Sequence, residues 1–210
     1  MSSDVILMAA ERMFAERGAG VALRDIAAAA GQRNNSAVHY HFGDRDGLVR
    51  AIVNRRLEAV EATCARLLPQ LDRGDDHAML AALVSSLLDG STQMGGRHYF
   101  RFLEVMRDQV KGWPVPAGGS AWNSITESLS ELVDGVTPAD RASRISSMTT
   151  AMFALLADYE RALDDPNHSP GTAPEHIVLM LVGLLRAPLT PAPNLSSYFT
   201  VSTQRLPSST

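Results

Sequence analysis

The sequence is poor in the features that mark secreted, disulfide-linked or membrane proteins. Its 210 residues include one cysteine, Cys64, which excludes an internal disulfide framework and a zinc site built from cysteines. The longest apolar run, Ile177 to Leu185, is about half of the roughly 18 to 20 residues that span a bilayer. The first residues lack the basic and then apolar pattern of a secretory signal. We therefore expect a cytoplasmic protein without membrane contact.

The sequence also lacks the short motifs of common catalytic sites. It contains no phosphate-binding Walker loop, no Rossmann glycine fingerprint, no G-x-S-x-G nucleophile turn and no H-E-x-x-H zinc helix. We therefore expect no catalytic residues, no metal ligands and no cofactor. A helical enzyme is the alternative, and turnover of a ligand would support it.

Positive charge is scarce overall but is concentrated near the N-terminus. The formal net charge is -4, which at first argues against nucleic acid as a partner. Residues 1–60, however, carry eight arginines against seven acidic residues, and residues 32–56 carry five arginines against two aspartates. DNA binding needs a local basic surface rather than a basic protein. The charge pattern is therefore compatible with double-stranded DNA as a partner of the N-terminal part.

Apolar residues repeat at three- and four-residue intervals along nearly the whole chain, and no segment has the alternation of a strand. The sequence therefore predicts an all-α fold, with Gly18, Gly31 and Pro69 at helix ends. The predicted helices cover about residues 3–17, 22–30, 34–41, 45–69, 75–90, 98–110, 120–133, 138–163 and 173–186.

Several details of these helices can be predicted. Thr137 to Asp140 is a capping motif, and Thr172 to Glu175 has the capping-box pattern. The helix that starts at Arg45 has one apolar stripe that we expect to be buried, made of Val53, Leu57, Val60, Cys64 and Leu67. We expect the arginines of the same helix to face solvent, and these are Arg50, Arg55 and Arg56.

Residues 23–48 have the pattern of a helix-turn-helix DNA-binding motif. A short alanine-rich segment ends at Gly31, which can adopt the left-handed backbone of a tight turn. The next segment places Val38 and Phe42 four residues apart on one helix face, where we expect them to pack inward. That packing turns polar side chains outward, as in a recognition helix that enters the major groove. The outward residues are Asn35, Ser36, His39 and Tyr40.

Four phrases of the sequence resemble the N-terminal domain of the TetR (tetracycline-repressor) family, over about residues 5–52. They are Ala9 to Gly18, Asp25 to Gly31, His39 to Phe42 and Arg45 to Leu48. The resemblance implies a three-helix helix-turn-helix DNA-binding domain at residues 1–50. It also implies a larger helical effector-binding and dimerisation domain at residues 51–187. Residues 188–210 are rich in Pro, Ser and Thr, and we expect a disordered tail there.

The resemblance implies DNA contacts at particular residues. His39 and Tyr40 stand where the family usually has two aromatic residues that touch phosphate, and Arg45 stands where it usually has a lysine with the same role. The expected DNA-binding residues are Gln32, Arg33, Asn34, Asn35, Ser36, His39, Tyr40 and Arg45. We expect His41 to be a packing histidine at the domain edge.

The sequence departs from the family pattern at two places. The family typically has six residues between the turn glycine and the first aromatic position, whereas seven residues separate Gly31 from His39 here. The family also often has a threonine that caps the second helix, and Val21 and Ala22 occupy that region instead.

In the resemblance, the larger domain holds a ligand cavity. Its apolar and aromatic residues indicate a mostly hydrophobic small-molecule effector, because such pockets use few polar groups. The candidate pocket residues are Leu83, Leu87, His98, Tyr99, Phe100, Leu103, Met106, Trp113, Trp122, Asn123, Ile125, Leu129 and Phe153. The alternative for each apolar member is plain core.

The last two predicted helices carry apolar stripes that could form a four-helix dimer interface. The first stripe is Ile145, Met148, Met152, Leu155, Leu156 and Tyr159. The second is Ile177, Met180, Leu181, Leu184 and Leu185. The alternative is that both stripes belong to the core of one chain.

Together these features predict a ligand-responsive transcriptional regulator. We expect a homodimer that binds a palindromic operator as a repressor and is released by its effector. An alternative is a helical dimer that acts through protein contacts without DNA, and it predicts no salt-dependent DNA affinity.

Overall fold

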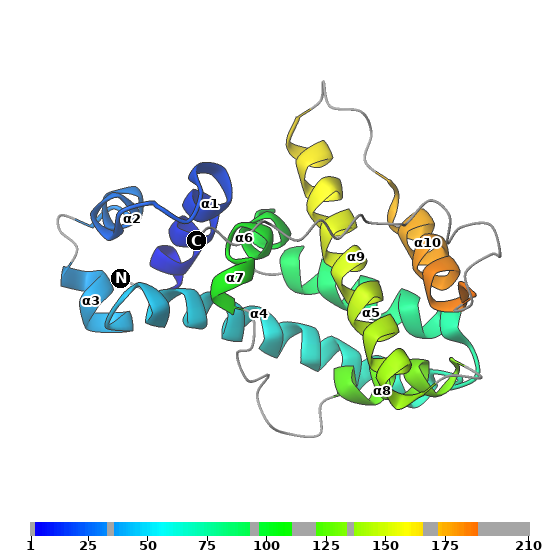
Figure 1. The fold of residues 1–210 in the computed structure, drawn as a ribbon. Helices are drawn as coiled ribbons and strands as arrows, with labels where there is room; N and C mark the ends of the chain where they lie inside the picture. The colour runs from blue at the N-terminus through cyan, green and yellow to red at the C-terminus, as the bar shows by residue number, and fades with distance from the viewer. Residues whose placement is uncertain are drawn as a thin grey trace, which may run out of the picture.

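Helices make up all the regular structure of the part of the chain that the structure describes (Figure 1). The computed structural model describes residues 3–32, 36–92, 97–110, 121–133, 137–165 and 172–188. The prediction of an all-α fold is therefore confirmed for these residues. None of the helices in these ranges is long and apolar enough to cross a membrane. The predicted tail beyond residue 188 lies outside the described residues.

Three helices form an N-terminal unit around one apolar centre. They are α1 (Ser3–Arg17), α2 (Leu23–Ala29) and α3 (Ser36–Phe42). Each helix turns apolar side chains inward, and the fully buried ones include Ala10, Phe14, Ile26, Ala27 and Val38. In Figure 1, α2 is seen nearly end-on while α3 lies across the view, so the two helices cross steeply. Ala27 lies on the inward face of α2 and is fully buried.

Two glycines are needed for the turns on either side of α3. Gly31 has a φ of 71°, which L side chains rarely adopt, and it follows the end of α2 as predicted. Gly47 lies in the first turn of the next helix, and a Cβ there would be 1.9 Å from the carbonyl oxygen of Phe42. A glycine at position 47 therefore lets the chain turn sharply from α3 into the next helix.

The long helix α4 (Arg45–Leu67) connects the N-terminal unit to the rest of the molecule (Figure 1). Asp44 caps it by accepting a hydrogen bond of 2.7 Å from the amide of Gly47. The helix gives way to a short 3-10 turn at Leu68–Gln70, which contains Pro69. Pro69 therefore lies just past the helix end, as predicted.

The prediction of the buried stripe of α4 is wrong in part. Val60 and Cys64 are buried, but Val53, Leu57 and Leu67 are only half-buried. The buried side of the helix instead contains Leu48, Val49, Ile52, Arg56, Val60, Thr63 and Cys64. The stripe shifts because α4 packs against α1 near its start and against α5 and α8 further along. Arg56 is 3% exposed, so the expectation that it faces solvent is also wrong.

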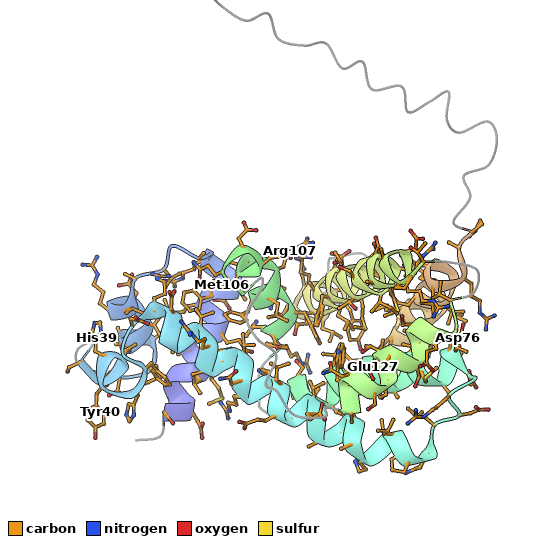
Figure 2. All side chains as sticks on the ribbon, turned by 60° about the horizontal axis from the view of Figure 1, so that its bottom comes forward. His39, Tyr40, Asp76, Met106, Arg107 and Glu127 are labelled. Atoms are coloured by element: carbon orange, nitrogen blue, oxygen red, sulfur yellow. The ribbon has the colours of Figure 1, made fainter. Side chains whose placement is uncertain are left out.

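Six further helices form what we call the helical body together with α4. They are α5 (Asp76–Thr92), α6 (Tyr99–Val105), α7 (Arg107–Val110), α8 (Ala121–Glu131), α9 (Pro138–Asp164) and α10 (Pro174–Arg186). Helix α5 packs against α4 and α10, while α6 packs between α1 and α9. Figure 2 shows the N-terminal unit at one end of the molecule and the body extending along α4. Helix α6 therefore lies at the junction of the N-terminal unit and the body.

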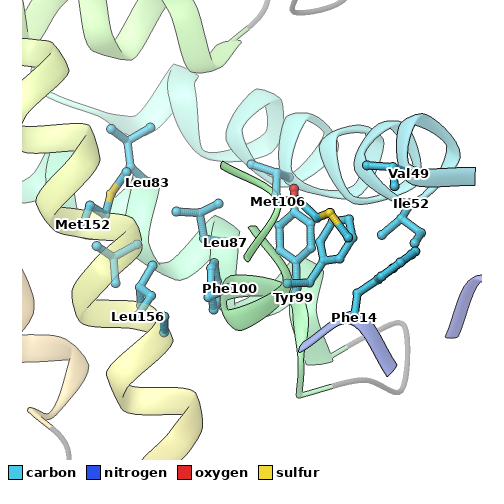
Figure 3. Packing of buried hydrophobic residues seen from close by; sticks show 14 of the residues in the cluster. Phe14, Val49, Ile52, Leu83, Leu87, Tyr99, Phe100, Met106, Met152 and Leu156 are labelled. Atoms are coloured by element: carbon cyan, nitrogen blue, oxygen red, sulfur yellow. The ribbon is translucent and has the colours of Figure 1, made fainter. Parts of the chain in front are cut away.

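The single helix predicted at residues 98–110 is two helices in the structure. Met106 has a φ of -94° and a ψ of 7°, which lies outside the helical region and interrupts the helical hydrogen bonds. Its side chain is fully buried near Phe14, Ile52 and Tyr99 (Figure 3). The predicted loop at residues 111–119 lies outside the described residues.

The two predicted capping motifs have different outcomes. At α9, Thr137 accepts a hydrogen bond from the amide of Asp140, and Asp140 accepts one from the amide of Thr137, so the capping box is confirmed. At α10, the N-cap is Ala173 and no side chain caps the helix. The capping box predicted at Thr172 is therefore wrong, because the helix starts one residue later than that pattern requires.

The difference between these two threonines can be measured. We expect Thr137→Ala to lower the free energy of unfolding by about 1 kcal/mol, because it removes an N-cap. Thr172→Ala is the matched control and is expected to change it by less than about 0.5 kcal/mol, as do most surface substitutions. Urea denaturation followed by circular dichroism measures both. Equal effects of the two substitutions would contradict the assignment of the caps.

Candidate nucleic-acid interface

One face of α3 points into solvent while the other closes the N-terminal unit. Val38 is fully buried and Phe42 is half-buried, as predicted. Ser36, His39 and Tyr40 are exposed, and Tyr40 is 86% exposed, although large aromatic residues usually lie inside. Figure 2 shows His39 and Tyr40 together at the end of the molecule farthest from the body. The helix therefore presents hydroxyl and imidazole groups to whatever docks there.

The ring of His39 is oriented by the turn that follows α3. Its Nδ1 lies 2.7 Å from the carbonyl oxygen of Gly43, and because a carbonyl only accepts, Nδ1 must carry the hydrogen. The neighbouring rings of Tyr40 and His41 meet edge to face, with centroids 5.1 Å apart. His41 is exposed, so the expectation that it packs into the domain edge is wrong. Its ring packs against its chain neighbours instead, edge to face with Tyr40 and tilted by 50° to Phe42.

The turn before α3 contains the other expected base-reading residues. Gln32 is half-buried, and its side-chain amide lies 3.5 Å from the carbonyl oxygen of Ala30, a long hydrogen bond. Arg33, Asn34 and Asn35 lie outside the described residues. Their contacts with DNA therefore stay predictions from the sequence.

Arg45 begins α4 and faces the N-terminal unit. Its guanidinium donates hydrogen bonds to the carbonyl oxygens of Ala19 and Val21 and lies 5.5 Å from the centre of the Phe14 ring. These contacts tie the start of α4 to the loop between α1 and α2, at the point where the usual threonine cap of α2 is missing. Helix α2 indeed has Ala22 as its N-cap and no side-chain cap. The phosphate contact predicted for Arg45 stays a prediction.

The sequence of this unit matches a known family. Residues 6–52 match the family model described as "Bacterial regulatory proteins, tetR family". The match runs from α1 into the first part of α4 and includes the exposed face of α3. The N-terminal unit is therefore a DNA-binding domain of the TetR type. The predicted resemblance is confirmed for these residues, and it identifies the protein as a DNA-binding transcriptional regulator.

Two solved structures are similar to this chain over most of its length. The TetR-like transcriptional regulator LfrR from Mycobacterium smegmatis, in complex with proflavine, has a TM-score of 0.52 and 24% identity and covers 90% of this chain and 97% of its own. NalD, the secondary repressor of the MexAB-OprM multidrug efflux pump in Pseudomonas aeruginosa, has a TM-score of 0.45 and 21% identity and covers 85% of this chain and 92% of its own. The likeness to LfrR extends the shared fold into the helical body. No curated protein matches the sequence significantly.

A buried ion pair joins the DNA-binding unit of the regulator to its body. Arg56 of α4 donates to both carboxylate oxygens of Glu11 in α1, at 2.8 and 2.5 Å, and the two side chains are 3% and 6% exposed. The remaining Nη1 donates to the carbonyl oxygens of Gly90 and Ser91 at the end of α5, at 2.8 and 2.9 Å. The guanidinium also lies 5.3 Å from the centre of the Tyr99 ring. This ion pair was not predicted from the sequence. Its one signal there is that Arg56 stands at the three- and four-residue spacing of the buried side of α4.

A second buried carboxylate of the regulator caps α6. Glu160 of α9 accepts hydrogen bonds from the amides of Phe100 and Arg101, at 3.0 and 3.1 Å, and it is 3% exposed. Burial is the largest cause that raises the pKa of Glu160, to about 7, against a lowering by the amide of Arg101 and by its charge. The protonation of this carboxyl group therefore changes near neutral pH.

The predicted pocket residues of the regulator fall into several classes. Seven are buried core: Leu83, Leu87, Tyr99, Phe100, Met106, Ile125 and Leu129. Four are half-buried: His98, Leu103, Trp122 and Phe153. Asn123 is exposed, and Trp113 lies outside the described residues. Figure 3 shows Leu83, Leu87 and Phe100 packed toward Met152 and Leu156 of α9, so these residues line the inside of the body.

The prediction of the dimer interface needs correction. Six of its residues are 4% exposed or less within a single chain: Met148, Met152, Leu156, Ile177, Leu181 and Leu185. These side chains already pack against one another and against α5, because α10 lies on both α9 and α5. They have no surface left for a partner. Ile145, Leu155, Tyr159 and Leu184 are half-buried, and Met180 is 44% exposed.

The raised pKa of Glu160 predicts a pH dependence of stability. The folded protein keeps a proton on Glu160 up to about pH 7, whereas the unfolded chain releases it near the ordinary glutamate pKa of 4.5, so the wild type loses stability as pH rises between these values. Glu160→Gln removes this loss. We expect the variant to gain about 1 to 3 kcal/mol relative to wild type between pH 4.5 and 7.5.

Urea denaturation at pH 4.5 and 7.5 measures this change. Glu104→Gln is the control, since it removes an exposed carboxylate that pairs with Arg161 on the same helix as Glu160. Parallel stability profiles of the wild type and Glu160→Gln would contradict the assignment.

Proposed function

We propose that this TetR-family regulator is a ligand-responsive repressor that binds a palindromic operator as a homodimer. The observation that carries the proposal is the polar face of α3. Ser36, His39 and Tyr40 are exposed there, on a helix whose other face is fixed by the fully buried Val38. A helix held in this way is a rigid element that can enter a major groove.

The chemistry of this face suits a DNA duplex. The Tyr40 hydroxyl can donate a hydrogen bond to a phosphate oxygen, and such contacts set the register of the protein without reading sequence. Ser36 and the preceding asparagines can read base edges, because an asparagine forms paired hydrogen bonds with adenine. The arginines around the motif supply the local positive charge. Positioning contacts and base-reading contacts are therefore assigned to different residues.

The helical body is the proposed effector domain. Its interior is apolar and aromatic, and four of the predicted pocket residues are half-buried, as the walls of a pocket would be. LfrR, which shares the fold, was solved with proflavine bound. We propose a small, mostly hydrophobic molecule as the effector.

The proposed response is a shift between two conformations. An effector that binds the body favours the arrangement in which the two DNA-binding units of the dimer are wrongly spaced for the operator. The free-energy change of this shift equals the difference between the effector's binding free energies for the two arrangements. By linkage, operator DNA weakens effector binding by the same factor.

The proposed dimer uses the outward faces of α9 and α10. These helices carry three of the exposed large apolar residues of the described chain: Leu163, Leu179 and Met180, which are 46%, 55% and 44% exposed. Leu179 and Met180 are adjacent on α10, and the nearby Gly183 has open space around it. A two-fold dimer through this face would match the two half-sites of a palindrome.

The DNA-binding residues predict two different effects on recognition. We expect Tyr40→Ala to weaken binding about fivefold on all sequences alike, because it removes a phosphate contact worth about 1 kcal/mol. Asn35→Ala is expected to change which bases are preferred. Binding to a set of operator variants measures both. Arg73→Ala is the control, since Arg73 is exposed in the turn between α4 and α5. Wild-type behaviour of both variants would contradict the proposed docking.

The dimer face predicts a loss of assembly when it is charged. We expect Leu179→Glu to convert the dimer to a monomer and to abolish tight binding to a palindrome, because a charge cannot be buried unpaired. Leu132→Glu is the matched control, since Leu132 is an exposed leucine just past α8. Sedimentation velocity at micromolar concentration measures the change. The same sedimentation coefficient for Leu179→Glu and the wild type would rule out this face.

A further inference from the structure

The guanidinium of Arg56 gathers three parts of the molecule at one point. Its two bonds to Glu11 hold α1, and its bonds to Gly90 and Ser91 hold the end of α5. Arg56 itself belongs to α4. Because these four bonds use Nε, Nη1 and Nη2 in a fixed plane, they specify the relative position of all three helices.

The polar contacts continue from Arg56 into α9 and α6. The hydroxyl of Ser91 lies 3.4 Å from Oε1 of Glu160, next to the carbonyl that Arg56 holds. The other oxygen of Glu160 accepts from the amides of Phe100 and Arg101 at the start of α6. A chain of buried hydrogen bonds thus leads from α1 of the DNA-binding unit to α6 and α9 of the body.

Apolar contacts cover the same junction. The rings of Phe14 in α1 and Phe102 in α6 are 6.0 Å apart, and Tyr99 lies between Phe102 and the guanidinium of Arg56. Figure 3 shows Phe14, Tyr99 and Met106 packed toward Val49 and Ile52 of α4. Apolar packing alone tolerates sliding, since it has little directional preference. The hydrogen bonds of the Arg56–Glu11 ion pair are directional, so they fix the relative orientation of the helices that apolar packing leaves free.

We propose that Arg56 is a positioning residue for DNA recognition. Through Glu11 it fixes the angle of the DNA-binding unit on the body, and through Ser91 and Glu160 it makes that angle depend on the position of α6 and α9. Half-site spacing in the operator is set by this angle in each subunit. The link to operator spacing rests on the proposed function, whereas the fixed angle is a property of the single chain.

The energetics favour a positioning role over a purely stabilising one. A buried ion pair costs desolvation, and well-packed apolar residues often replace it without loss of stability. Removing one partner is different, because it leaves the other charge buried and unpaired. The informative variant therefore replaces both residues at once.

The test compares Glu11→Met/Arg56→Met with a matched control that acts on the same two helices. Asp4 of α1 and Arg55 of α4 also form an ion pair, at 3.6 Å, but it is partly exposed. The control is Asp4→Asn/Arg55→Gln. Arg56→Lys is the conservative variant, since lysine keeps the charge but has no fork to hold Glu11 and two carbonyls together.

The first measurement is a distance within one chain. Spin labels are placed at exposed Arg24 of α2 and exposed Ser85 of α5, with Cys64→Ala throughout and excess unlabelled protein added. We expect a narrow distance distribution for the wild type and the control, and a broad one for the double variant at unchanged helix content. Arg56→Lys is expected to lie between them. A narrow, unshifted distribution in the double variant would overturn the proposal.

The second measurement is DNA affinity as a function of half-site spacing. A palindrome enriched from random duplexes is lengthened and shortened by two base pairs. When the half-site spacing is changed, we expect the wild type and the control to lose about tenfold more affinity than the double variant does. A tenfold effect lies within the usual range of coupling between two sites. Identical spacing profiles would overturn the link to recognition. If the wild type enriches no site at all, the proposed function fails, and the distance measurement still decides whether Arg56 fixes the angle.

Discussion

The arrangement of this regulator depends on the burial of one arginine. Arg56 is 3% exposed and is neutralised by Glu11, 45 residues earlier, and by the carbonyl end of α5. A cation at a helix C-terminus is favourable, because the unpaired carbonyl groups carry partial negative charge there. Helix α1 can therefore belong to the DNA-binding unit and be anchored to the helical body at the same time. It is part of the core of the DNA-binding unit through Phe14, and it is bound to the body through Glu11.

In the N-terminal part of the protein, the polar residues that hold the structure together differ from those that face solvent. The chain has a formal net charge of -4, yet residues 32–56 carry five arginines against two aspartates, and α3 exposes Tyr40. Arg45 donates to the carbonyl groups of the loop that lacks a threonine cap, so an arginine holds the unit together where a hydroxyl usually would. The exposed face of α3 is thus left to Ser36, His39 and Tyr40. Rigid support beneath a small polar face is what recognition of a groove requires.

Local features of the sequence predicted much of the fold. Gly31 ends α2, Thr137 caps α9, and Val38 is buried, because turn geometry, capping and helical spacing are short-range effects. The solvent-facing prediction for Arg56 failed because its partners come from three distant elements. The dimer stripe failed at Met152 and Leu181 for a related reason. An apolar stripe shows that a helix face is buried, but it does not show whether the same chain or a partner covers it.

The central claim is that this protein is a dimeric, sequence-specific DNA-binding regulator. The most direct test is to select duplexes from a random library with the full chain at two salt concentrations. The account predicts enrichment of a palindromic site, with an affinity that falls steeply as salt rises, because bound phosphates release counterions. Absence of enrichment, or an affinity that does not change with salt, would contradict it. In that case the helix-turn-helix would be structural, and a helical protein-interaction module would be the better account.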